Sequence, residues 1–177
     1  MKAQFWSFDI IFAVIIFVFA VVILTLIWIN ITDEFAISYG TNLARIQAQL
    51  QSLGIQILSA GSPPNWNSVM SLSSSGTWEN LSIGLGNGTV GVLSQQKINA
   101  FYNMSATNYQ ASKPPLGVAY DYYITVAGSG VNTVTMGMNP AITNVTSVQV
   151  TTLPAVLNGK PVQVQIQLWT NSTLGIE

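Results

Sequence analysis

Positions 10–29 form a strongly apolar run, and this stretch contains no charged residue, no proline and no glycine. Twenty helical residues at about 1.5 Å each span the roughly 30 Å hydrocarbon core of a bilayer. The pattern therefore predicts a transmembrane helix. A secretory signal peptide has a shorter apolar region and a small-residue cleavage site, whereas polar residues 30–34 follow here. We expect the segment to stay in the mature protein.

Beyond residue 30 the apolar positions recur in steps of three and four, which is typical of one face of a continuing helix. Gly40 and Gly54 weaken such a helix by about 1 kcal/mol each without ending it, and the first proline follows Ser62. We therefore predict one helix over residues 5–60, with an apolar first half and an amphipathic second half. The amphipathic stripe consists of Ala36, Tyr39, Leu43, Ile46, Leu50, Leu53 and Ile57.

Period-two alternation dominates residues 61–177, and such alternation is typical of half-buried strands in an antiparallel sheet. It is clearest over 118–126, 134–138 and 162–168. The sequence therefore predicts an α+β fold, in which the long N-terminal helix packs on a mainly antiparallel β-rich head domain. We expect the strands to follow one another as a meander.

Local signals add detail to the head domain. Asn158-Gly159 favours a two-residue type I′ turn, although Pro154 disturbs the strand before it. Residues 81–85 read as a short strand that follows a loop. A short helix is predicted over 94–102, with Ser94 as N-cap. Its buried face is expected to consist of Ile98, Phe101 and Tyr102.

Composition restricts the chemistry available to the chain. Charged residues make up 6% of the 177 positions and the net charge is −1, so the clustered cations needed for nucleic-acid binding are missing. The chain has no Cys and no His, which removes thiolate chemistry and the commonest general base and metal ligand. We predict no enzyme, no cofactor and no catalytic or metal-binding residue. The few possible catalytic groups are scattered along the chain: Glu79, Asp121, Glu177, Lys97, Lys113 and Lys160.

The charges that flank the apolar run suggest an orientation. Lys2 and the amino terminus lie before the run, and Asp33 and Glu34 follow it. The positive-inside rule then places the amino terminus inside and the head outside. Asn-X-Ser/Thr sequons, which carry sugar only on exterior segments, agree with this, although a chain rich in Asn, Ser and Thr also produces them by chance. The candidate glycosylation sites are Asn30, Asn80, Asn87, Asn103, Asn144 and Asn171.

Asp9 is a lone carboxylate at the start of the apolar run, where burial in lipid is costly unless the charge is paired or lies at the interface. One interpretation places it at the headgroup level, near the first helical turn, with Trp6 as an interfacial anchor. The other gives it a role in protein assembly.

A short Lys-containing leader, an acidic residue at the start of an apolar helix, a heptad-like extension and a β-rich head together resemble type IV pilins, especially archaeal pilin-like proteins. In that family a prepilin peptidase cuts just before the apolar segment. The start Met1-Lys2-Ala3-Gln4 is similar to an archaeal class III signal peptide. Cleavage between Gln4 and Phe5 would make Asp9 the fifth mature residue, where the family usually has Glu, and cleavage after Ala3 would make it the sixth.

The resemblance implies a structural subunit of an extracellular filament, a homo-oligomer that serves surface adhesion and starts as a membrane-anchored precursor. It implies a short leader over 1–4, and as partners the membrane, the prepilin peptidase, the assembly machinery and N-linked glycans. Asp9 would pair with the amino terminus of a neighbouring subunit, while Phe8, Phe12, Phe17 and Phe19 supply packed area. The alternative is a surface protein that does not polymerise, or a minor pilin, whose head binds an envelope partner.

Overall fold

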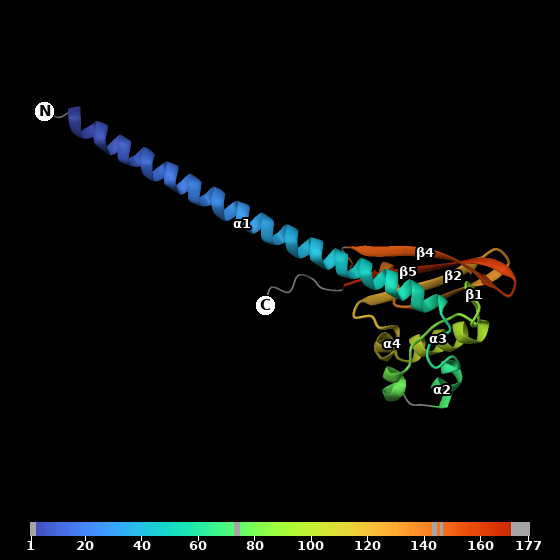
Figure 1. Ribbon diagram of the computed structural model, residues 1–177. Helices are drawn as coiled ribbons and strands as arrows, with labels where there is room; N and C mark the ends of the chain where they lie inside the picture. The colour runs from blue at the N-terminus through green and yellow to red at the C-terminus, as the bar shows by residue number, and fades with distance from the viewer. Residues whose placement is uncertain (1–2, 73–74, 143–144, 146, 171–177) are drawn as a thin grey trace. The chain divides into compact units, whose positions relative to one another are not determined.

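The computed structural model describes residues 3–72, 75–142, 145 and 147–170. The chain divides into two compact units, Met1–Ala44 and Arg45–Glu177. Helix α1, Ala3–Leu58, contributes to both units (Figure 1). Its ends lie within two residues of the predicted range of 5–60, and the predicted α+β class is confirmed.

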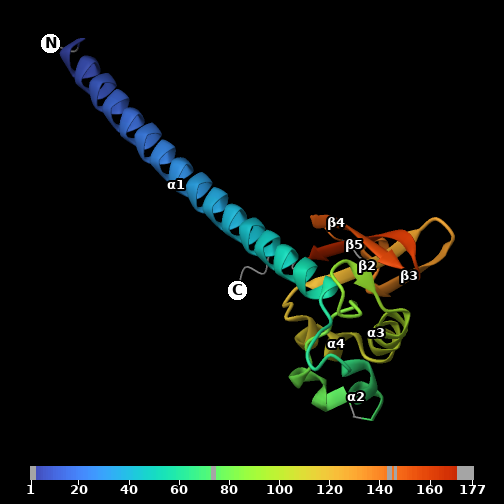
Figure 2. The same ribbon diagram turned by 45° about the vertical axis from the view of Figure 1, so that its right-hand side comes forward.

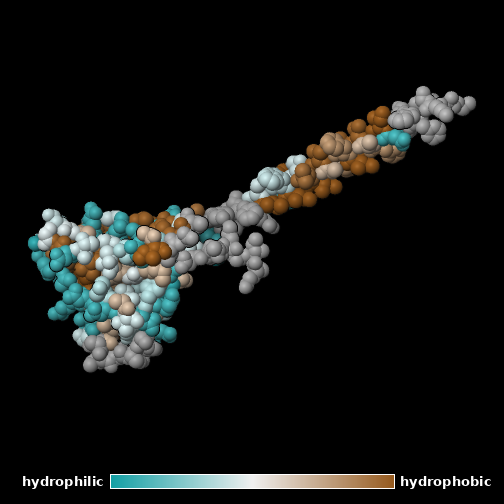
Figure 3. Space-filling model, turned by 180° about the vertical axis from the view of Figure 1, so that it is seen from behind, coloured by the Kyte–Doolittle hydropathy of each residue, from teal (hydrophilic) through white to brown (hydrophobic). Residues whose placement is uncertain are grey.

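The first unit is the N-terminal part of α1. Within it, the 24-residue stretch Asp9–Thr32 is long and apolar enough to cross a membrane, with a mean hydropathy of 3.5 over an 18-residue window, none of which is buried. Figure 3 shows the hydrophobic colour over most of the visible surface of this stretch. By length and composition the helix can serve as a membrane anchor or as a signal sequence.

The second unit combines the end of α1 with short helices and a five-stranded mixed sheet. Its further elements are α2 Trp66–Leu72, the 3₁₀ helix η1 Ser75–Asn80, β1 Val92–Leu93, α3 Gln95–Thr107, α4 Tyr109–Leu116, β2 Asp121–Gly128, β3 Val131–Gly137, the 3₁₀ helix η2 Pro140–Ile142, β4 Val148–Leu157 and β5 Lys160–Trp169. In Figure 2 α3 and α4 lie together on one side of the sheet.

The strand order is β1-β4-β5-β2-β3, with β1 parallel to β4 and every other pair antiparallel. The sheet is therefore mainly antiparallel, as predicted, but the expected meander is wrong, because β5 pairs with β2 and not only with its hairpin partner β4. The inward residues of β5 are at most 3% exposed: Val162, Val164, Ile166 and Leu168. β5 lies between β4 and β2, and its inward face forms part of the core.

The predicted turn at Asn158-Gly159 is confirmed. Both residues have positive φ, 53° and 77°, and Leu157 pairs with Lys160, as a two-residue type I′ hairpin requires. Pro154 stands inside β4 without breaking it. β1 reaches only Val156 and Leu157, so the missing N–H of Pro154 falls where β4 has an open edge.

The predicted stripe of α1 forms part of the core of the second unit. Ile46, Leu50, Leu53 and Ile57 are at most 7% exposed and lie in one cluster with the inward residues of β2 and β5. Leu43, which precedes them in the stripe, is 38% exposed. Amphipathic packing is thus confirmed for the last four turns of α1.

The predicted short helix is present but longer than expected. α3 runs from Gln95 to Thr107, and Ser94 is its N-cap residue, although its side chain makes no capping bond. Ile98 and Phe101 are fully buried as predicted. Tyr102 is wrong as a core residue, because it is 48% exposed and Met104 takes the buried position one turn after Phe101.

The predicted strand over 81–85 is also wrong, although Ile83 and Leu85 are fully buried. Their N–H groups donate to Pro115 O at 3.0 Å and to Ile57 O at 2.7 Å, which belong to the ends of helices and not to a strand. Alternation alone cannot tell a strand from a buried loop that satisfies its donors in this way.

Helix α4 was not foreseen, because Pro114 and Pro115 normally end a helix. The prolines fall in its last turn. The side chain of Asn108 accepts a hydrogen bond from Ala111 N at the start, and Gly117, with φ of 66°, ends the helix in the left-handed conformation. Its caps thus stabilise a helix of only eight residues.

Candidate functional site

The surface of the apolar span is hydrophobic on every side. Phe12, Phe17 and Phe19 are 61%, 68% and 64% exposed. Phe12 and Phe19 are two turns apart on one face, whereas Phe17 lies on another face. A helix that is apolar all round is stable only inside a protein assembly or a membrane. The span therefore requires a covering that the described residues of this chain do not supply.

The two threonine hydroxyls within the span are satisfied by the helix itself. The Thr25 hydroxyl donates to Val21 O at 2.8 Å, and the Thr32 hydroxyl donates to Trp28 O at 2.8 Å. Such bonds to the preceding turn leave no free hydroxyl donor toward apolar surroundings. The two threonines therefore allow the span to be buried without a large penalty.

Asp9 is the one charged residue between positions 9 and 32. No acidic residue lies in the first turn of α1, and the effect of the helix dipole fades beyond that turn. The dipole therefore gives Asp9 little stabilisation, and in an apolar environment its carboxylate needs a partner from outside the helix.

The residues of the predicted processing site, Ala3, Gln4 and Phe5, belong to α1, as does Phe8. Their side chains lie outside the part of the structure that is described. Among the sequons, Asn80, Asn87 and Asn103 are exposed on the second unit, and Asn30 lies near the end of the candidate span. Asn144 and Asn171 lie outside the described residues. The Oδ1 atom of Asn87 accepts a hydrogen bond from Thr89 N at 2.8 Å.

The structure brings two of the scattered charged groups together. Lys113 on α4 forms an ion pair with Asp121 at the start of β2, with 2.5 Å between Nζ and Oδ1. The Tyr109 hydroxyl donates to the same carboxylate oxygen at 2.9 Å and accepts from Tyr122 N at 3.0 Å. Ser112 and Tyr122 join the cluster through a short bond between their hydroxyls.

This cluster fastens α4 to the sheet. Burial raises the pKa of both Tyr109 and Tyr122 above the usual value of 10.0. Both phenols therefore keep their protons at neutral pH, whereas a general base must be deprotonated. Sequence reasoning missed Tyr109 and Ser112 as members of this cluster. The available signal was the spacing of four residues between Tyr109 and Lys113 and of three between Tyr109 and Ser112, which makes each pair neighbours on a helix.

Lys97 is buried, with 7% of its surface exposed, and among the described residues no carboxylate forms an ion pair with it. Its ammonium donates to Ala60 O at 2.7 Å and to Gly86 O at 2.9 Å. Burial lowers the pKa of Lys97 from its usual value of 10.5. The side chain thus ties the segment that follows α1 to the loop before β1.

The remaining charged candidates stay apart. Glu79 is exposed, Lys160 donates to Gly130 O at 2.6 Å, and Glu177 lies outside the described residues. Within the described part of the chain, no three His, Cys, Asp or Glu residues gather in a way that could hold a metal ion.

The layout of the chain, an apolar N-terminal helix followed by a sheet-rich head, fits that of a pilin. Comparisons with family models, with curated proteins and with solved structures gave no match.

Proposed function

We propose that this chain is the structural subunit of an extracellular type IV pilus-like filament and assembles through its hydrophobic N-terminal helix. The observation that carries the proposal is the uncovered apolar surface of Asp9–Thr32 with a single carboxylate at its start. A membrane anchor needs the apolar surface but has no use for the charge. A helical assembly has a use for both.

Assembly would transfer the span from lipid into a bundle of identical helices. Lipid tails and apolar side chains are similarly apolar, so the gain comes from close packing of residues such as Phe12, Phe17 and Phe19. A head-to-tail contact that does not close on itself produces an open filament. One set of self-complementary surfaces is therefore sufficient.

Asp9 would fix the axial position of each subunit. Pairing with the amino terminus of a neighbour neutralises the carboxylate, whereas a shifted subunit leaves it buried without a partner. Breaking a buried ion pair in this way typically costs about 3–5 kcal/mol. This penalty on a shifted subunit would let the ion pair fix the axial register of the filament. The free amino terminus would be produced by the prepilin peptidase.

The second candidate is a membrane-anchored surface protein or minor pilin whose head binds an envelope partner. The polar pocket of the head, described below, favours a binding role for that domain. Both candidates place the protein at the cell surface, with the head outside. They differ in whether the span ends in a filament or remains in lipid.

The test is to compare wild type, Asp9→Asn and Asp9→Glu in the native host. The sheared surface fraction is sedimented and the membrane fraction is blotted for the subunit, and the intact mass of each form is measured. We expect wild type and Asp9→Glu to give filaments of subunits that lack three or four N-terminal residues. Asp9→Asn should leave the protein in the membrane fraction at a normal level.

Two results would contradict the proposal. A wild-type protein found only in the membrane at its full-length mass would favour the anchor. Abundant filaments of Asp9→Asn would show that the carboxylate does not guide assembly.

A further inference from the structure

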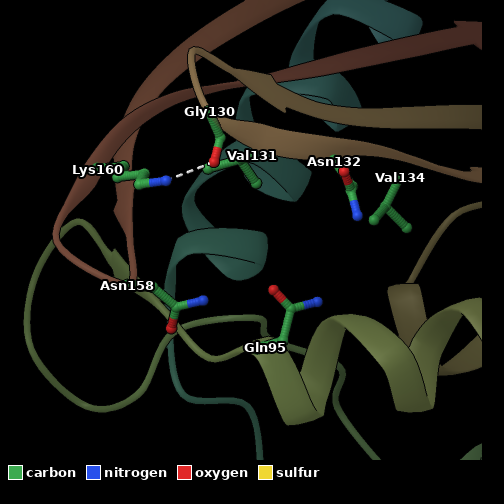
Figure 4. A pocket seen from close by; sticks show the side chains of 7 residues that line it. All are labelled: Gln95, Gly130, Val131, Asn132, Val134, Asn158 and Lys160. Atoms are coloured by element: carbon green, nitrogen blue, oxygen red, sulfur yellow. Dashed lines mark hydrogen bonds between the residues drawn. The ribbon is translucent and has the colours of Figure 1, made fainter.

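A polar pocket of about 300 Å³ lies at one end of the head, where two hairpin turns face the start of α3. Its lining comes from three parts of the chain that are distant in sequence (Figure 4). The β2–β3 turn and the adjoining strand contribute Gly130, Val131, Asn132 and Val134, the β4–β5 turn contributes Asn158 and Lys160, and α3 contributes Gln95.

The side chains of Gln95, Asn132 and Asn158 point into the space between these elements (Figure 4). Among the seven lining residues the one hydrogen bond joins Lys160 Nζ to Gly130 O at 2.6 Å. Outside this set, Gln95 Nε2 donates to Asn99 Oδ1 at 3.0 Å, so the Gln95 carbonyl keeps its acceptor capacity. The pocket thus presents three amide groups whose capacity is largely unused.

The chemistry of the lining selects the class of ligand. Each amide side chain offers one acceptor oxygen and an NH₂ group with two donors. A ligand with neighbouring hydroxyl groups can use both, because a hydroxyl donates one hydrogen bond and accepts others. No carboxylate lines the pocket, so a cation finds no counter-charge, and no aromatic ring offers a stacking surface for a nucleobase. Val131 and Val134 supply a small apolar surface for the C–H groups of a ring.

We propose that this pocket binds one saccharide unit, such as the terminal sugar of a surface glycan. Its volume lies at the lower limit of small-molecule sites, which suits a single ring and not an extended peptide. The hairpin turns are held by their own backbone: Asn158 and Gly159 form the type I′ turn, and the Lys160 ammonium anchors the β2–β3 turn through Gly130. The backbone that carries Asn132 and Asn158 is therefore held in place before any ligand arrives.

The inference goes beyond the proposed function and does not depend on it. A head that binds a sugar serves an adhesive filament and a monomeric surface protein equally well. A test on single subunits in micelles therefore stands whether or not the protein forms filaments.

The experiment is a titration of the full-length, isotope-labelled chain in phosphocholine micelles, which avoid detergents with sugar head groups. The probes are glucose, galactose, mannose and N-acetylglucosamine, with glucuronate and inorganic phosphate as the anionic arm. The side-chain NH₂ signals of Gln95, Asn132 and Asn158 report binding directly. We expect saturable shifts of these signals with at least one neutral sugar, with a Kd of about 1 mM.

Matched variants locate the site. The double variant Gln95→Leu with Asn132→Val should weaken binding at least about tenfold, which equals roughly 1.4 kcal/mol. Gln163→Leu removes an exposed amide from the opposite face of the sheet and should leave binding unchanged. Lys160→Gln serves the anionic arm, because Lys160 is the cation that lines the pocket.

Three outcomes would overturn the proposal. The neutral sugars could produce no saturable shifts, or the double variant could bind them as wild type does. Shifts with glucuronate and phosphate alone, lost in Lys160→Gln, would identify an anion site instead.

Discussion

Truncation of Ile57 tests whether the end of α1 belongs to the core of the head. Ile57 is fully buried, whereas Ile55, two residues earlier on the same helix, is 77% exposed. Because Ile57 lies in one cluster with the inward residues of the sheet, Ile57→Ala should leave a cavity between helix and strands. Truncations of buried Ile to Ala typically cost about 2–5 kcal/mol.

The position of Ile57 favours the middle to upper part of that range. Leu85 N donates to Ile57 O at 2.7 Å, so the backbone here is held by a second contact and cannot readily collapse into the cavity. For a folded unit of this size the loss corresponds to a melting temperature lower by roughly 10 °C. Ile55→Ala is the matched control and should change stability by no more than about 0.5 kcal/mol.

The assay is thermal and denaturant unfolding of the full-length variants in micelles, followed by near-ultraviolet circular dichroism. This signal arises from packed aromatic residues of the head such as Trp66 and Tyr122, which are fully buried. The apolar helix itself contributes little to the transition. Equal melting temperatures for Ile57→Ala and Ile55→Ala would refute the assignment of the last turns of α1 to the head.

Two further predictions concern the buried polar groups. Lys97→Met should destabilise the head by about 2–4 kcal/mol, because Ala60 O and Gly86 O both lose their hydrogen-bond donor. The control Lys160→Met removes an exposed lysine and should destabilise the head much less. Equal losses of melting temperature in the two variants would contradict this role of Lys97. The head should also lose stability above pH 10, because burial raises the pKa of Tyr109 and Tyr122 and keeps both phenols protonated in the folded state, while the unfolded chain releases these protons near 10.0. Each phenol contributes a loss of about 1 kcal/mol per pH unit. The lowered pKa of Lys97 acts in the opposite direction, because the folded protein releases this proton below 10.5. Tyr122→Phe removes the contribution of one phenol, so its melts between pH 9 and 11 should show a smaller alkaline loss of stability than wild type.

The long helix could be read from the sequence because its signals are local. The apolar run of 10–29 and the stripe from Ile46 to Ile57 each follow the period of a helix. The Asn158-Gly159 turn belongs to the same class, since positive φ at both positions is a property of those two residues. Short-range periodicity and turn preference were sufficient for these elements.

Only the tertiary structure decided the strand order. The pairing of β5 with β2 depends on which surfaces meet when the chain collapses, and the sequence pattern of neither strand indicates its partner. The same holds for the contact of Lys97 with Ala60, 37 residues earlier, and for the pocket that joins residues 95, 130 and 158. The α4 helix was hidden for a different reason: its caps outweigh the prolines that argue against it. The sequence by itself determined which segments are helical, apolar or alternating, since those properties arise between near neighbours, whereas long-range pairing depends on shape and burial across the whole head.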